Sequence, residues 1–288
     1  MRILLFRLGF VHQKNLDGFK AICKSLDAEL VIRTTFKACK EPWDLVWIPF
    51  GLVDTKGLSA AKRIVLGPHN FVFPEDNWYI SFNDPRASYN CLSDWNHKIY
   101  YNMGGVGDLK LDCLPFPVDT NSFVPSPIEK MYDCFIYTKL RRPGDIDYAV
   151  NALKEMGLTY KHIGYGSYTE NEYKEVLATC RFGVWVGRHE SQGFALQEAL
   201  SSGVPLVVWD VETMGEEWSG QQIYTGEAAS RAATAAPYWD ARCGIKVRRE
   251  NLKEGLRFMR NTWAMHKPRD FIMETLSVEA CAKLWLEN

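Results

Sequence analysis

The sequence lacks the features that mark several common classes of protein. Its eight cysteines are scattered along 288 residues, without a Cys-x-x-Cys pair or a paired-histidine spacing, which disfavours a disulfide framework and a zinc site. No apolar run approaches the ~20 residues of a transmembrane helix, and the charged N-terminal segment is too short for a signal peptide. We therefore expect a soluble, cytoplasmic protein without a transmembrane segment.

Neither positive nor negative charge is in excess. The formal net charge is −1, so the composition gives no sign of the basic face that binds a phosphate backbone, and we expect no nucleic-acid partner. No cluster of histidines and carboxylates with metal-ligand spacing stands out, so we expect a site without a metal ion.

What is present is an alternation of short apolar runs with segments of helical periodicity. A first series has expected strands at 3–8, 29–32, 44–49, 63–66, 79–82 and 90–92, with a helix at 16–26. A second series has expected strands at 134–138, 160–163, 182–186, 204–209 and 243–247, with helices at 146–156, 172–179, 252–263 and 278–286. The proline-rich stretch 111–127 is the expected linker, because its prolines hold the chain extended. Such alternation predicts an α/β protein with parallel sheets, divided into two Rossmann-like domains at 1–118 and 119–269.

Two glutamates, Glu190 and Glu198, lie between the apolar runs 182–186 and 204–209. The pattern predicts a strand, a turn that contains Gly193, a short helix and a second strand. In such a unit the turn and the helix N-terminus lie at the carboxyl end of the first strand, where α/β proteins bind ligands and where free N–H groups suit a phosphate. Two carboxylates there can accept hydrogen bonds from hydroxyls, which fits a sugar nucleotide.

This stretch resembles the E-x7-E motif of retaining GT-B glycosyltransferases of the family 4-like type. Seven positions fall in register with that motif: Glu190, Gly193, Phe194, Glu198, Ala199, Gly203 and Pro205. The segment from Val118 to Pro125 also resembles the one at the domain junction of these enzymes. The resemblance implies a compact GT-B fold, two Rossmann-like domains facing across a cleft, with residues 270–288 packing back on the first domain.

The resemblance also implies a function: transfer of a sugar from a UDP-, GDP- or other nucleotide-diphospho sugar to a glycan or other hydroxyl acceptor, with retention and without a metal. Glu198 would bind the ribose and Glu190 the transferred sugar. Amides near Gly193, Phe194 and Ala195 would hold the diphosphate.

Three further groups are candidates by position. Lys139 and Arg142 follow the first strand of the second series, where fixed cations can stabilise a departing diphosphate. The turn Gly164-Tyr165-Gly166 resembles the loop beneath the nucleotide base. His69 ends a strand of the first series and, by the resemblance, faces the donor sugar.

Two other interpretations remain open. One is a GT-B sugar-nucleotide epimerase, which would need acid and base carboxylates in the first domain. The other is a catalytically silent sugar-nucleotide binding module, which the reduced first domain favours.

Overall fold

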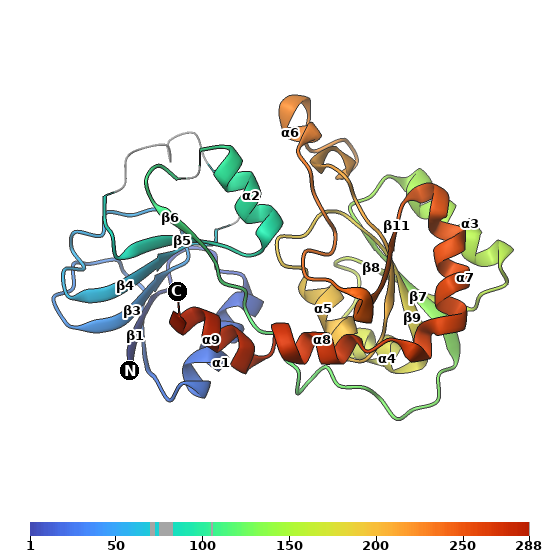
Figure 1. Ribbon diagram of the computed structural model, residues 1–288, viewed down its shortest axis with the longest axis horizontal. Coiled ribbons are helices and arrows are strands. Elements are labelled where there is room, and N and C mark those ends of the chain that lie inside the picture. Colours follow the sequence, from blue (N-terminus) through green and yellow to red (C-terminus); the bar gives the residue numbers. More distant parts are fainter. Residues whose placement is uncertain (70–72, 75–82, 105, 288) are drawn as a thin grey trace. The chain divides into compact units, whose positions relative to one another are not determined.

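The chain folds into two α/β units, each built on a parallel sheet (Figure 1). The computed structural model describes residues 1–69, 73–74, 83–104 and 106–287. The first unit comprises Met1–Pro117 with Leu276–Asn288, and the second comprises Val118–Thr275. The sequence-based division falls after residue 118 and begins the returning segment at residue 270, whereas the structure changes units at Leu276.

The first unit contains a six-stranded parallel sheet with the strand order β2-β1-β3-β4-β5-β6. Its strands are β1 (Arg2–Phe6), β2 (Glu29–Arg33), β3 (Trp43–Ile48), β4 (Ala61–Leu66), β5 (Ala87–Cys91) and β6 (Lys110–Cys113). Its helices are α1 (Gln13–Ser25), α2 (Asp94–Asn102) and α9 (Val278–Glu287). The central strands are near-continuous apolar runs because both faces of a parallel sheet are covered.

An aromatic cluster around Trp47 packs helices α1 and α9 against this sheet. The Trp47 ring lies 4.3 Å from that of Phe19 on α1 and 5.9 Å from that of Trp285 on α9, between ring centroids. The indole Nε1 of Trp285 donates to the carbonyl of Pro115 at 3.1 Å, and Arg63 donates to the carbonyl of Trp285 at 2.5 Å. These contacts account for the return of the C-terminal helix to the first unit.

The second unit contains a five-stranded parallel sheet with the strand order β11-β10-β9-β7-β8. Its strands are β7 (Tyr132–Lys139), β8 (Tyr160–Gly164), β9 (Cys180–Gly187), β10 (Leu206–Trp209) and β11 (Gly244–Val247). Its α-helices are α3 (Pro143–Glu155), α4 (Glu170–Thr179), α5 (Phe194–Ser201), α6 (Gly226–Ser230), α7 (Leu252–Thr262) and α8 (Pro268–Thr275). Four short 3-10 helices complete it: η2 (Met214–Glu216), η3 (Ala241–Cys243), η4 (Arg249–Asn251) and η5 (Trp263–Met265).

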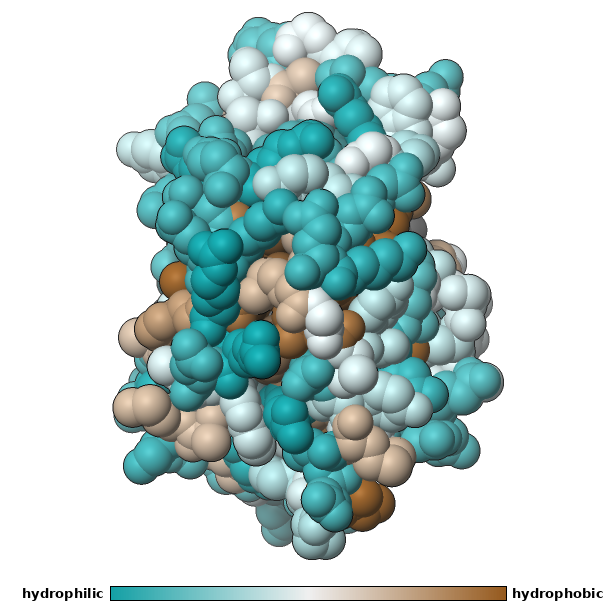
Figure 2. All heavy atoms as spheres, turned by 90° about the vertical axis from the view of Figure 1, so that its right-hand side faces the viewer, coloured by the Kyte–Doolittle hydropathy of each residue, from teal (hydrophilic) through white to brown (hydrophobic). Residues whose placement is uncertain are grey.

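The core of the second unit is formed where apolar strands meet one face of each helix. Trp185 on β9 stacks on Tyr137 of the neighbouring strand β7, with ring centroids 3.9 Å apart. Helix α7 buries Leu252, Leu256 and Met259 and turns charged side chains outward. The face of this unit seen in Figure 2 is accordingly mostly hydrophilic.

Most of the expected elements are present, although helices α2 and α8 were not expected. Two further differences concern the expected linker and the segment between β10 and β11. The expected linker 111–127 begins too early, because Lys110–Cys113 forms strand β6 beside β5. Its first proline is Pro115, so nothing before that residue opposes a strand. The segment between β10 and β11, for which no element was expected, carries η2 and α6 and is closed by a bridge between Thr213 and Ala232. The expected strand at 79–82 lies outside the described residues.

Candidate functional site

The motif that contains both glutamates folds into a turn between β9 and α5. The last residue before α5 is Gly193, with a left-handed φ of 86°. A side chain there would strain the backbone whatever the space around it, which explains the glycine. A Cβ atom built at Gly193 would also lie 3.4 Å from the Cβ of Glu190. The turn therefore holds Glu190 against the start of helix α5.

Glu190 forms an ion pair with Lys139. The Lys139 Nζ lies 2.6 Å from the Glu190 Oε1, and the two side chains are 10% and 12% exposed. The pairing of β7 with β9, which sets Lys139 opposite Gly187, brings the two residues together. The Nζ also lies 4.3 Å from the centre of the Tyr165 ring. Three residues predicted separately from the sequence thus meet at the carboxyl ends of three neighbouring strands.

Tyr165 belongs to the turn that follows β8. Its backbone N–H donates to the carbonyl of Thr138 on β7 at 2.9 Å, and Gly166 adopts a φ of 78°. Tyr165 is 57% exposed although Lys139 lies against its ring. A turn fixed to the sheet, with an exposed ring and free space around Gly166, can present a flat surface to a ligand.

Glu198 lies on helix α5 and is 6% exposed. Its neighbour Tyr173 donates from its hydroxyl to the carbonyl of Ala195 at 2.7 Å. Burial, and secondarily the charge of Glu198, raises the pKa of the Tyr173 phenol well above its usual range. Glu198 is therefore a buried carboxylate on the same short helix whose first turn contains Phe194 and Ala195.

The arginines that follow β7 have different environments. Arg141 is buried: it contacts Asp145 at 3.3 Å and the carbonyl of Gly187 at 3.3 Å, so it holds the sheet edge together. Arg142 is exposed and immediately precedes helix α3. Its guanidinium lies 5.6 Å from the centre of the Trp218 ring and 3.5 Å from the Gln222 Oε1. The structure thus does not bring Arg142 into the ion pair of Lys139 and Glu190.

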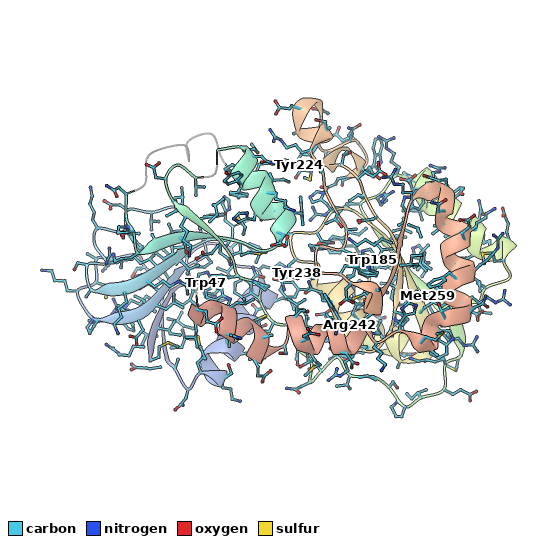
Figure 3. The ribbon with its side chains drawn as sticks, in the orientation of Figure 1. Trp47, Trp185, Tyr224, Tyr238, Arg242 and Met259 are labelled. Carbon is cyan, nitrogen blue, oxygen red and sulfur yellow. The ribbon has the colours of Figure 1, made fainter. Side chains whose placement is uncertain are left out.

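A second charged cluster adjoins this pair, and sequence reasoning assigned it no role. The Arg188 Nη1 lies 3.3 Å from the Glu217 Oε2 and 3.0 Å from the His189 Nε2. Burial, together with the charges of Arg188 and Lys139, lowers the pKa of His189 well below its usual value. Burial raises the pKa of Glu217. The Tyr224 ring lies 5.8 Å from that of His189 and belongs to the segment between β10 and β11 (Figure 3). The only sequence signal for this cluster is that Arg188 and His189 directly precede Glu190.

His69 belongs to the first unit and follows β4. Its Nδ1 lies 2.9 Å from the hydroxyl of Tyr89, and burial lowers the pKa of the imidazole to about 4. Tyr89 in turn packs closely on Gly67, where a Cβ atom would lie 2.7 Å from the ring. The position of His69 is therefore fixed by Tyr89 on the adjacent strand β5.

Metal ligands and pockets were considered separately. No group of three or more His, Cys, Asp or Glu side chains among the described residues is placed to hold a metal ion. One Asp-x-Asp spacing occurs at Asp145 and Asp147 on α3, where Asp145 is engaged by Arg141 and Arg249. A pocket of about 780 Å³ between β11 and α7 is lined by none of the predicted site residues. No helix of the described chain is long and apolar enough to cross a membrane.

Comparison with known proteins gives a likeness in fold. No family model matches the chain, and no curated protein matches it in sequence. Among solved structures, it resembles the lipopolysaccharide outer core galactosyltransferase WaaB, with a TM-score of 0.54 and 12% identity over 99% of this chain and 98% of that one.

Two further structures are similar. A TarM variant from S. aureus, solved with fondaparinux, α-GlcNAc-glycerol and UDP, has a TM-score of 0.52 and 14% identity over 79% of this chain and 50% of that one. The present chain thus spans about half the length of TarM. The catalytic domain of starch synthase IV from Arabidopsis thaliana, bound to ADP and acarbose, has a TM-score of 0.51 and 10% identity over 86% of this chain and 72% of that one. The predicted fold class, two Rossmann-like α/β domains as in GT-B glycosyltransferases, is confirmed.

Proposed function

We propose that this chain is a retaining glycosyltransferase that moves a hexose from a nucleotide-diphospho sugar to a hydroxyl of a glycan or another acceptor, without a metal ion. The observation that carries the proposal is the cluster of Lys139, Glu190 and Tyr165 beside the left-handed Gly193. The likeness in fold to a galactosyltransferase, and to chains solved with UDP or ADP, supports it.

The nucleotide end of the donor is assigned to two elements. Glu198 would accept hydrogen bonds from the ribose hydroxyls, and the main chain of Gly164 to Gly166 would meet the base edge. Tyr165 is exposed enough to stack on that base. The burial of Glu198 strengthens its hydrogen bonds, because less water competes for the carboxylate.

The diphosphate is assigned to the first amides of α5, near Gly193, Phe194 and Ala195, and to Lys139 and Arg142. In the unliganded chain the charge of Lys139 is shared with Glu190. A diphosphate that contacts Lys139 would weaken this pair and leave Glu190 available to the hydroxyls of the transferred sugar.

The reaction follows from these contacts. The bond between the anomeric carbon and the phosphate oxygen breaks, and its electron pair stays on the departing nucleoside diphosphate. The acceptor oxygen forms the new bond to the anomeric carbon, and its proton passes to the departing diphosphate. Fixed cations near that diphosphate lower the barrier, because they stabilise charge that grows only in the transition state. From the family resemblance, His69 is assigned a place facing the donor sugar.

The test is incubation with a panel of radiolabelled nucleotide sugars, with and without glycan acceptors. Labelled glycan would support a transferase, and NMR of its anomeric configuration would decide retention. Conversion of the nucleotide sugar without an acceptor would instead indicate an epimerase. Binding without turnover would indicate a silent module, and a chain that binds no nucleotide sugar would contradict the proposal.

A further inference from the structure

Arg188 is placed beside Lys139 by the sheet itself. It directly follows β9, and its backbone N–H donates to the carbonyl of Lys139 at 2.9 Å. Since β7 and β9 are neighbouring parallel strands, both residues lie at the same edge of the sheet. Two cations from strands that are distant in sequence are thereby fixed side by side, next to the turn that leads to α5.

The guanidinium of Arg188 is held by Glu217 and His189. Its Nη1 lies 3.3 Å from the Glu217 Oε2 and 3.0 Å from the His189 Nε2. Glu217 is itself fixed, because the next residue, Trp218, donates from its backbone N–H to the carbonyl of Leu140 at 2.9 Å. The side chain of Arg188 is 25% exposed, so it is anchored and still partly accessible to solvent.

One donor of this guanidinium is unsatisfied. The Nε–H of Arg188 is buried and meets no acceptor within the described part of the chain. Buried donors in folded proteins are nearly always paired, so an unpaired one at a ligand site points to an acceptor that arrives with the ligand. The fork formed by Nε and the Nη groups matches the oxygens of a phosphate.

The other arginines of this edge do not have these properties. Arg141 is 1% exposed and engaged by Asp145 and Glu216. Arg142 is exposed, lies against Trp218 and has no part in the ion pair of Lys139. Arg188 therefore combines proximity to Lys139, a fixed head group and an available donor.

We propose that Arg188, together with Lys139, binds the diphosphate of the donor. Glu217 holds the Arg188 guanidinium in place and offsets its positive charge until the diphosphate binds. This inference rests on the proposed function and adds to it a phosphate-binding residue that the motif does not contain.

The experiment titrates UDP, GDP and ADP, and in parallel the corresponding nucleosides, into the intact chain and its variants. Arg188→Ala is expected to weaken binding of the preferred nucleoside diphosphate about tenfold or more, the effect of one charged hydrogen bond, and to leave nucleoside affinity unchanged. The matched control is Arg181→Ala on the same strand, because Arg181 lies at the opposite end of β9 and pairs with Asp133 at 2.7 Å. It should alter neither affinity.

Glu217→Gln separates a binding role from a structural one. Removing the carboxylate charge should tighten diphosphate binding, which is opposite in sign to the effect of Arg188→Ala, whereas loss of a structural contact would weaken binding in both variants. If Arg188→Ala does not fold, Arg188→Lys serves in its place, since it keeps the charge but loses the fork and should bind the diphosphate more weakly.

Two further results would overturn the inference. Wild-type diphosphate affinity in Arg188→Ala or Arg188→Lys would remove Arg188 from the site while leaving the proposed function intact. A wild-type chain that binds no nucleoside diphosphate would overturn the proposed function and this assignment together.

Discussion

At the residue scale, Glu198 offers the most direct test of the nucleotide site. Glu198→Gln keeps the size of this buried side chain and removes its charge. A hydrogen bond to a charged group contributes about 1.5–3 kcal/mol, so affinity for the preferred nucleoside diphosphate should fall about tenfold or more. Calorimetric titration measures this affinity, and Glu254→Gln on the exposed side of α7 is the control. Unchanged affinity in Glu198→Gln would exclude Glu198 from the site.

A site residue can be predicted from the sequence when the residue and its partner both lie in recognisable sequence patterns. Glu190 and Lys139 are 51 positions apart. Glu190 was predicted from the resemblance to the E-x7-E motif, and Lys139 because it follows an apolar strand. Arg188 was not predicted, because an arginine that follows a strand cannot be told in sequence from a solvent-exposed charge. Its partner Glu217 lies in a segment without periodicity, so no spacing could have linked the two.

His69 should make the stability of the chain depend on pH. Burial lowers its pKa from 6.5 to about 4 in the folded state. Between these pH values the unfolded chain binds a proton that the folded chain does not, so stability must fall as the pH drops from about 6.5 towards 4. The stabilising effect of the neutral ring is fully present above this range. The Tyr89 hydroxyl lies 2.9 Å from the His69 Nδ1 and 3.2 Å from the Tyr100 hydroxyl. Tyr89 stays neutral throughout this range, because burial raises the pKa of its phenol.

Urea unfolding at pH 7 and pH 5 measures this dependence of stability on pH. The wild-type chain should lose more stability between the two pH values than His69→Gln, which has no proton to bind. Effects of His189, whose pKa is also lowered, are present in both proteins and cancel. Asp84 titrates below the range, because Arg86 holds its pKa at about 2. Equal losses in both proteins would show that His69 is not buried as a neutral ring.

At the scale of elements, the turn before α5 depends on a single backbone conformation. Gly193→Ala places a side chain at a φ of 86°, which should cost about 1–2 kcal/mol of stability. The strain would also displace the first amides of α5, which are assigned to the diphosphate, and so weaken nucleoside diphosphate binding. Gly144→Ala is the matched control: it lies in the first turn of α3 with no atom within 4 Å of a built Cβ and should be neutral or stabilising. Equal effects of the two substitutions on the urea midpoint would contradict this account.

The strands that sequence predicted well are those with an apolar, buried centre. The strands β7, β9 and β10 have such centres, and their expected and observed limits differ by a few residues. Helix α2, with only Asn96, Ile99 and Tyr100 buried, has too narrow an apolar face to be recognised. The segment between β10 and β11 is built from short turns and bridges, which carry no period.

At the scale of the whole molecule, the fold is far better preserved than the sequence. The likeness to WaaB covers 99% of the chain at 12% identity. Parallel sheets require apolar strands and correctly placed turns, and many sequences meet that requirement. The roles of individual residues therefore have to be argued from the site and tested there.

The proposed absence of a metal ion is tested on the whole chain, and transfer should continue in EDTA. The proposed site supplies positive charge from Lys139, Arg142 and the N-terminus of α5, which can take the place of a cation on the diphosphate. The transfer rate is measured with and without excess EDTA, with a second sample in which magnesium exceeds the chelator to control for effects of EDTA itself. We expect the same rate in all three. Loss of transfer in EDTA that magnesium or manganese restores would mean that a metal ion holds the diphosphate, and the two cations would then need another role.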